Sequence, residues 1–380
     1  MFDDIRPYRD SEIPAAMNRI AVHPLFQSLA SFVFPGRPVE EIRDMVRSIG
    51  SVRDFQFKVM YHLNRRIIEN SITGFTCSGI ENIVPGRAHT FVSNHRDIML
   101  DAALLQNILV DNGLDTTEIT FGANLMQDSL VVDIGKSNKM FRVERPGGNM
   151  REFLRASRHL SDYIRDSVAG RGQSVWIAQR NGRTKDGIDR TDQGIINMFR
   201  ASGTGDMAGS IAGLNIVPVS VSYEWEPCDI LKTVELYARQ SGPYIKKPGE
   251  DIESILTGIR QPKGRVHFSI CKPVTEHDLD KFRDLRPNDF NRQVATLIDR
   301  RICSSYRLYP GNWVAHDILS GTGSFHTRYT ESDKAALLRR MSLLDSCPGD
   351  ADVLRSIFLG IYAGPVDSAA KFSGNDETDS

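Results

Sequence analysis

The sequence has few cysteines, and their spacing excludes several kinds of site. The five cysteines are scattered, odd in number, and form no C-x-x-C pair: Cys77, Cys228, Cys271, Cys303 and Cys347. This pattern predicts reduced thiols in a cytosolic compartment and no zinc site, and we expect no metal to be required. The nucleophile elbow G-x-S-x-G is also absent, which argues against a hydrolase that uses it.

The sequence also lacks long hydrophobic runs. No uninterrupted apolar stretch approaches the ~18 residues that a membrane-spanning helix requires, so we expect any membrane contact to be peripheral. The first residues, MFDDIRPYRDSEIP, are acidic and polar, which is not the pattern of a secretory signal. We therefore expect a cytoplasmic protein.

The sequence lacks an excess of positive or negative charge over its whole length. The formal net charge is -1, and we expect no nucleic-acid partner. Between Gly135 and Arg200, however, 14 Lys and Arg residues stand against 7 Asp and Glu residues, a local balance of +7. Such a window suits an anionic ligand such as a phosphate, although part of it is explained equally well by the solvated face of one amphipathic helix, 151–168.

Hydrophobic periodicity predicts an α/β protein. Residues 1–72 keep helical spacing with a break at Gly50. Strand-like segments then alternate with helices at 98–110, 151–168 and 193–200; the strands are expected at 75–80, 89–93, 118–123, 140–145, 174–179, 216–224 and 265–274. This order predicts a mixed, partly parallel sheet flanked by helices. Pro218, inside one of these strands, predicts an edge or strand-start position.

The same patterns divide the chain into regions. We expect an N-terminal helical region at 1–72, an α/β domain at 73–305, and a C-terminal helical region at 306–365 with helices near 331–345 and 351–362. The remaining residues, 366–380, are polar and acidic toward their end and predict a disordered tail.

The stretch Phe91–Leu105, FVSNHRDIMLDAALL, predicts a strand, a polar turn and the start of a helix. A turn at a strand end can present His95 to a substrate, and Asp101 could orient its imidazole and stabilise the charged form. The alternative is that Ser93, Asn94 or Asp97 is only a helix cap and His95 an ordinary turn residue.

Two further segments carry candidate ligand-binding cations. In GKSNKMFRVERPGG (135–148), Arg142 and Arg145 should diverge across a short strand, and we favour Arg145, at the strand end, for a ligand. In SVWIAQRNGRTKDG (174–187), Gly182 would let backbone amides approach an anion and Arg183 could bind a phosphate in bidentate fashion. A plain surface hairpin explains the Asn-Gly pair equally well.

The order and content of these blocks resemble the glycerolipid acyltransferase superfamily, which includes glycerol-3-phosphate and 1-acylglycerol-3-phosphate acyltransferases. The blocks are SNHRDIMLD, MFRVER, IAQRNGRTKDG and IVPVSVSYE, and KGRVHFSICKPV resembles a late strand of that fold. The resemblance covers about residues 75–275. It departs from the family pattern in two places: five residues rather than four separate His95 from Asp101, so that Asp97 could substitute for Asp101, and Gln179 stands where the family has Glu, followed by an extra Arg180.

The resemblance implies a peripheral O-acyltransferase at the inner face of the cell membrane, with no bound cofactor. His95 would deprotonate the acceptor hydroxyl, Asp101 would hold His95, and acyl-CoA or acyl carrier protein would supply the acyl group. Arg145, Gly182, Arg183 and Lys185 would bind the phosphate of a glycerol phosphate or lysophospholipid acceptor. Two alternatives stay open: an acyltransferase for an amino-acid-based lipid, and a non-catalytic lipid-binding relative.

Overall fold

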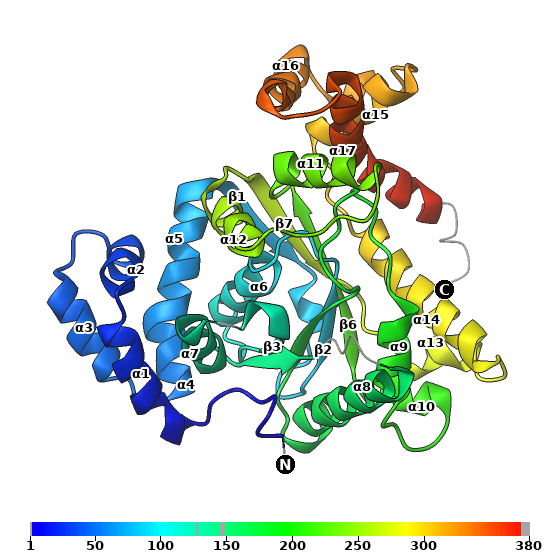
Figure 1. Cartoon of the computed structure of the whole chain (residues 1–380). Coiled ribbons are helices and arrows are strands. Elements are labelled where there is room, and N and C mark those ends of the chain that lie inside the picture. The colour runs from blue at the N-terminus through cyan, green and yellow to red at the C-terminus, as the bar shows by residue number, and fades with distance from the viewer. Residues whose placement is uncertain (1, 127, 145–148, 374–380) are drawn as a thin grey trace.

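The computed structural model describes residues 2–126, 128–144 and 149–373. Seven strands form one sheet in the order β1-β7-β6-β2-β5-β3-β4 (Figure 1). Their bounds are β1 Ile72–Ser78, β2 Thr90–Ser93, β3 Glu118–Gly122, β4 Met140–Val143, β5 Val175–Ala178, β6 Ile216–Tyr223 and β7 Gly264–Ile270. Neighbouring strands are parallel except for β6 and β7, which are antiparallel. The prediction of a mixed, partly parallel sheet is confirmed.

Helices cover both faces of the sheet, as the continuous apolar runs in its central strands require. One face packs its apolar side chains, including Phe91 and Trp176, against α5 and α6; the other packs Val92 and Ile177 against α8, α9, α10 and α14. The helices of this part of the chain are α5 Tyr61–Ser71, α6 Leu100–Asp111, α7 Ser129–Ser137, α8 Met150–Arg165, α9 Gln193–Arg200, α10 Met207–Ala212, α11 Asp229–Arg239, α12 Glu250–Arg260, α13 Glu276–Asp280 and α14 Pro287–Ser304.

The predicted N-terminal helical layer is present. It consists of α1 Ile13–Val22, α2 Phe26–Val33, α3 Val39–Arg47 and α4 Val52–Phe55, which continues through Gln56–Met60 into α5. The break expected at Gly50 separates α3 from α4. The stripe that includes Ile42, Val46 and Phe55 is buried in a core of its own, so it faces protein and not solvent.

The C-terminal region contains α15 Pro310–Ser320, α16 Glu331–Met341 and α17 Ala351–Phe372. The tail predicted from residue 366 is wrong in its start, because α17 continues to Phe372 with Val366 and Phe372 buried. The buried apolar residues of α17 continue on both sides of Pro365. The polar residues at the end of the sequence predict an earlier end of the helix. The division into domains stays a prediction. Gly187, in the loop after β5, lies so close to α17 that a β-carbon there would collide with the carbonyl oxygen of Ile361.

Pro218 also departs from its predicted position. It is the third residue of β6, an interior strand between β2 and β7, and not an edge or strand-start residue. Its carbonyl accepts a hydrogen bond from the backbone nitrogen of Cys271 at 2.9 Å, just beyond the end of β7 at Ile270. The residues of β6 that pair with β7 begin at Val219, so the missing donor of Pro218 falls just outside this ladder.

Candidate active site

The turn after β2 places His95 and Asp101 in contact. β2 ends at Ser93 in the middle of the sheet, with β5 and β6 on either side, and α6 begins at Leu100. Nδ1 of His95 lies 2.9 Å from Oδ2 of Asp101. Asp97 plays a different part, because its Oδ1 accepts hydrogen bonds from the backbone nitrogens of Met99 and Leu100, both at 2.9 Å, and so caps the helix.

The Asp101 carboxylate is fully buried and held by several donors. Besides His95, its Oδ2 accepts from the backbone nitrogens of Arg96 at 2.6 Å and Asp97 at 2.9 Å, while its Oδ1 accepts from the Tyr223 hydroxyl at 2.8 Å. Because residues 94–99 are not helical, the turn absorbs the additional residue between His95 and Asp101 before α6 begins. The longer spacing therefore still brings the carboxylate to the imidazole.

Burial shifts the ionisation of the groups around this pair. The pKa of Tyr223 is raised well above its usual value by burial and by the charge of Asp101, so its hydroxyl stays a hydrogen-bond donor. The pKa of Asp97 is raised by burial and by the nearby Asp101. The carboxylate behind the His95 imidazole is therefore held by hydrogen bonds from a neutral hydroxyl and two backbone nitrogens.

The His95 side chain is 13% exposed and has one open side. Its ring meets Trp176 edge-on, with centroids 5.8 Å apart, and its carbonyl accepts from the backbone nitrogen of Thr184 at 2.6 Å. Within the described part of the chain, Nε2 of His95 has no hydrogen-bond partner. Since His95 lines two cavities, this nitrogen is available to a bound molecule.

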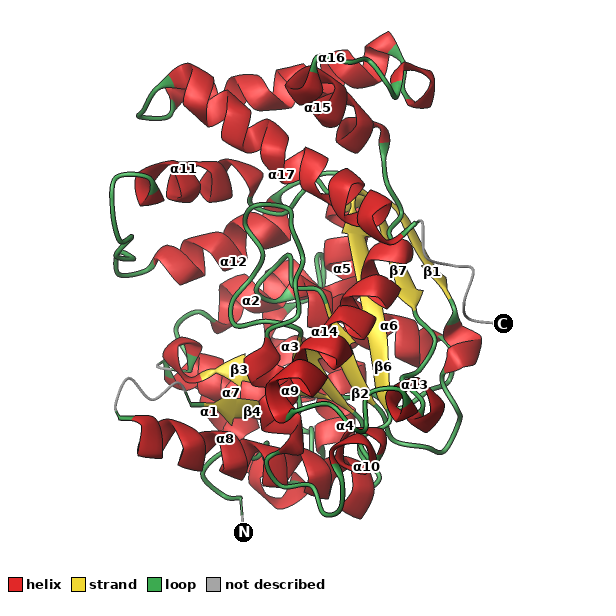
Figure 2. Cartoon of the chain, turned by 90° about the vertical axis from the view of Figure 1, so that its right-hand side faces the viewer, coloured by secondary structure: helices red, strands yellow, loops and turns green. Residues whose placement is uncertain are grey.

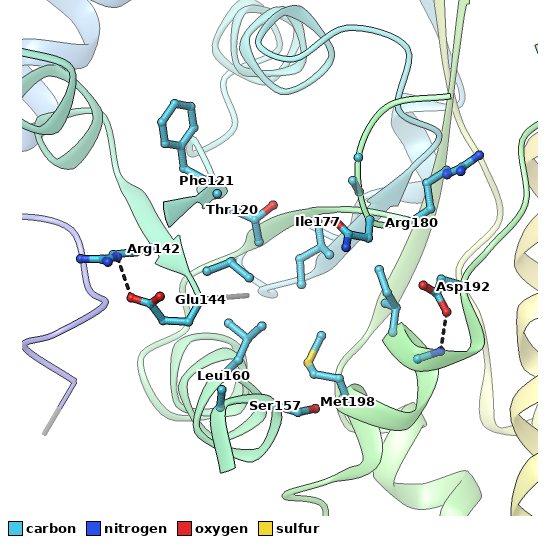
Figure 3. Close-up of a pocket in the computed structure, with 18 of the residues that line it drawn as sticks. Thr120, Phe121, Arg142, Glu144, Ser157, Leu160, Ile177, Arg180, Asp192 and Met198 are labelled. Atoms are coloured by element: carbon cyan, nitrogen blue, oxygen red, sulfur yellow. Dashed lines mark hydrogen bonds and ion pairs between the residues drawn. The ribbon is translucent and has the colours of Figure 1, made fainter. Parts of the chain in front are cut away.

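The first cavity is mostly apolar and has a volume of about 430 Å³. It lies between β3, β4, β5, α8 and α9, and in Figure 3 the side chains of Ile177, Leu160 and Met198 converge on it. Arg142 also lines it but forms an ion pair with Glu144 at 2.7 Å. The lining suits a hydrocarbon chain, because apolar surface is released from water there.

The second cavity is polar and has a volume of about 420 Å³. It shares His95, Ile98 and Leu125 with the apolar cavity, together with residues 180–182. Its remaining wall comes from the loop after β5 and from the α11–α12 region, including Arg239 and Lys246. His95 thus stands where an apolar and a basic cavity meet.

The family model described as Acyltransferase matches residues 74–222. This range contains β2, the His95 turn, β5 with its following loop, and nearly all of β6. This part of the chain is similar to the acyltransferase family.

The chain is also similar to solved structures. The 1-acyl-sn-glycerophosphate (LPA) acyltransferase PlsC from Thermotoga maritima is similar over 75% of this chain and 92% of its own, at 13% sequence identity and a TM-score of 0.40. No curated protein matches the chain.

The loop after β5 carries three of the predicted binding residues. Gly182 has a positive φ of 72° and open space around its α-carbon, as close backbone approach to a ligand needs. Arg183 lines the polar cavity and donates from Nη2 to Oγ of Ser254 on α12 at 2.8 Å. Lys185 lines it too, paired with Glu235 of α11, and burial lowers its pKa.

Gln179, which stands where the family has Glu, lies outside both cavities. Gln179 is fully buried; its backbone bonds to Ser93 and Asp192, and its side chain reaches toward Thr191. It lines neither cavity, so the missing Glu charge is not a feature of the cavity walls. Arg145, the residue favoured at the end of β4, lies outside the described residues.

A buried ionic network beneath the His95 turn was not predicted from the sequence. Arg96 donates to Asp189 at 2.8 Å and to Glu226 at 3.3 Å, and Lys232 donates to Glu226 at 2.6 Å and to the Arg96 carbonyl at 2.7 Å. The Arg96 guanidinium holds the pKa of Asp189 below its usual value against the effect of burial. Arg96 stood in the motif, but its partners are single charges in distant loops.

Neither a metal-binding cluster nor a membrane-spanning helix occurs among the described residues. No group of three or more of their His, Cys, Asp and Glu side chains could hold a metal ion. In the same residues, no helix is long and apolar enough to cross a membrane.

Proposed function

We propose that this protein is an acyltransferase that moves a fatty acyl group from a thioester, acyl-CoA or acyl carrier protein, to the hydroxyl of a glycerol phosphate or lysophospholipid. The observation that carries the proposal is the position of His95 at the junction of the apolar and polar cavities. The acyl chain would lie in the apolar cavity and the acceptor head group in the polar one. Their reacting atoms would then meet beside His95.

The chemistry needs one proton carrier and no covalent acyl-enzyme. Nε2 of His95 takes the proton of the acceptor hydroxyl while the oxygen attacks the thioester carbonyl carbon. The C–S bond then breaks, an ester forms, and the thiolate leaves with the proton returned by His95. Asp101 accepts the Nδ1 hydrogen bond throughout and stabilises the charged imidazolium.

The predicted phosphate ligands are part of the proposal. Gly182, Arg183 and Lys185 wall the polar cavity, and their positions support binding of an acceptor phosphate there. Arg145 remains a candidate for the same role.

Peripheral membrane binding is also part of the proposal, and the first turns of α8 support it. Met150, Phe153 and Leu154 are 71%, 50% and 51% exposed, and the neighbouring Arg151 and Arg155 are exposed as well. Phe153 also lines the apolar cavity. An exposed apolar cluster flanked by two arginines, with the exposed Glu152 between them, suits a phospholipid surface, from which an acyl chain could enter the cavity directly. Figure 2 shows this end of α8 projecting at the left of the molecule.

The experiment is acyl transfer from radiolabelled acyl-CoA and acyl carrier protein to glycerol 3-phosphate, lysophosphatidate and a lyso-aminolipid. The wild type is compared with His95→Ala and Asp101→Asn, and with His326→Ala as a control at an exposed histidine outside both cavities. We expect turnover on a phosphate acceptor that the first two changes abolish or reduce at least 100-fold. Turnover only on the aminolipid would replace the acceptor, and a folded protein without turnover on any acceptor would refute the enzymatic proposal.

A further inference from the structure

The polar cavity carries a surplus of positive charge, and its side chains differ in how far that charge is already neutralised. Five cations line it in the described part of the chain: Arg180, Arg183, Lys185, Arg239 and Lys246. Three carboxylates lie among or against them: Asp186, Asp251 and Glu235. Among the side chains that line the cavity or pair with its cations, the surplus is therefore two positive charges, which favours an anionic ligand.

Three of the cations are already paired with carboxylates. Lys185 and Arg239 share Glu235, the latter with Nη2 and Oε1 2.7 Å apart, and Lys246 pairs with Asp251. A bound anion would have to compete with these carboxylates. Lys185, Arg239 and Lys246 therefore shape the cavity and contribute little free charge.

Arg183 is partly engaged as well. Its Nη2 donates to Ser254, a neutral partner, while its Nη1 is buried without a hydrogen-bond partner. The guanidinium is drawn toward α12, forms no ion pair there, and interacts electrostatically with the buried Asp97. It can raise the potential of the cavity from this position while α12 restricts its movement.

Arg180 is different from the other four. Within the described part of the chain it has no hydrogen-bond or ion-pair partner, and it lines both cavities beside His95. Figure 3 shows its guanidinium turned away from Leu160 and Met198, the apolar side of the site. It is also the residue that the third sequence block has in excess of the family pattern.

The charge of a phosphate monoester matches this arrangement. Such a group carries about -1.5 to -2 charges at pH 7 and presents several acceptor oxygens. An unpaired guanidinium binds it through two parallel N–H···O bonds, which fixes orientation as well as charge. A short spacer between phosphate and hydroxyl, as in glycerol phosphate, would keep the hydroxyl at the junction where His95 stands.

We propose that Arg180 is the anchor for the phosphate monoester of the acyl acceptor, and that Arg183 supports it electrostatically from the loop after β5, where its side chain is held by Ser254 of α12. This assignment rests on the proposed acyl transfer and deepens it, because it makes the acceptor a phosphate monoester and gives the principal contact to a residue outside the family pattern.

The test combines steady-state kinetics with a ³¹P NMR titration of glycerol 3-phosphate, which reports binding without turnover. Arg180→Gln is compared with Arg180→Lys and with Arg190→Gln, an exposed arginine of the same loop that lines neither cavity. Loss of a charged hydrogen-bond pair predicts that Arg180→Gln raises the acceptor KM and the phosphate dissociation constant about 10- to 100-fold. The donor KM should stay within twofold, and Arg180→Lys should recover part of the loss.

Three results would overturn the assignment. Arg180→Gln could match Arg190→Gln in acceptor binding, or it could raise the KM of the donor in place of that of the acceptor, which would assign Arg180 to the phosphates of the donor. Glycerol 3-phosphate could also fail to bind the wild type at millimolar concentration. If the wild type binds it through Arg180 but transfers no acyl group, the proposed reaction fails and the phosphate site stands.

Discussion

Replacing Tyr223 with Phe removes the hydrogen bond that fixes one oxygen of the Asp101 carboxylate. Oδ1 of Asp101 has the Tyr223 hydroxyl at 2.8 Å, whereas His95 and two backbone nitrogens all bond to Oδ2. In the variant, Oδ1 is left buried and without this donor. The carboxylate can then rotate about its Cβ–Cγ bond, and the imidazole loses its fixed orientation.

The magnitude follows from the kind of bond removed. A hydrogen bond to a charged group contributes about 1.5–3 kcal/mol, and each 1.36 kcal/mol of barrier is a factor of ten in rate. If the whole loss falls on the transition state, kcat drops about 10- to 150-fold. KM for donor and acceptor should change less than threefold, because Tyr223 lines neither cavity. Tyr223 is therefore a positioning residue, which acts by holding the Asp101 carboxylate.

The assay is kcat and KM for acyl transfer, with thermal unfolding of the same preparations. Tyr163→Phe is the matched control: the Tyr163 hydroxyl donates to the buried Glu118 at 2.7 Å, at the start of β3 and far from the strand ends that hold His95. Both variants should lose similar stability, and only Tyr223→Phe should lose kcat. A folded Tyr223→Phe enzyme with kcat within twofold of wild type, or an equal loss in Tyr163→Phe, would show that the bond only supports the fold.

Further predictions concern stability, chain length and membrane binding. Burial raises the pKa of Asp299 from 3.8 to about 6. The contribution of Asp299 to stability is therefore complete below pH 4 and is lost as the pH rises to 6. Asp299→Asn should match the wild type near pH 4 and be more stable above pH 6, by about 3 kcal/mol in thermal unfolding. Leu160→Trp should fill the apolar cavity and cut kcat/KM for long acyl donors about 100-fold while short donors react, since each buried CH₂ is worth about 0.8 kcal/mol. Phe153→Ser with Leu154→Ser should weaken binding to vesicles containing anionic phospholipid at least tenfold in sedimentation assays.

Each of these has its own control. The Asn side chain at position 299 keeps the oxygen that accepts from Thr191, so a stabilisation that does not change with pH would contradict the pKa assignment. A uniform loss across chain lengths would mean that Leu160 supports the fold and not the cavity. For membrane binding, Ile318→Ser with Leu319→Ser changes a comparable exposed pair on α15; equal loss in both double variants would exclude a specific role for α8.

Much of the fold could be predicted because the sequence patterns are local. Runs such as VWIA and IVPVSVSY belong to strands buried on both faces, and helical spacing predicted α9 with its observed bounds. The contact between His95 and Asp101 was predictable for the same reason, since both residues lie within one turn and the start of one helix.

What could not be predicted depends on distant parts of the chain. Whether Pro218 disrupts a strand depends on where β7 ends, some 50 residues later. Asp189 and Glu226 are single charges in loops, and nothing local to them indicates that both pair with Arg96. Glu235 of α11 neutralises Lys185, and Asp251 of α12 neutralises Lys246. Neither of these helices, both described in full, supplies a carboxylate to Arg180. A motif gives a residue's type and its place, but its partners follow from tertiary packing.

The close approach of Gly187 to α17 limits which insertions this protein can accept during evolution. The loop that carries Gly182 and Arg183 fits against the backbone of Ile361 with no room for a side chain. An insertion in that loop would be tolerated only with a matching shift of the C-terminal helix. The length of this loop and the position of α17 should thus covary among related sequences. Residues 74–222 grafted onto another scaffold would lack the α17 backbone against which the loop packs.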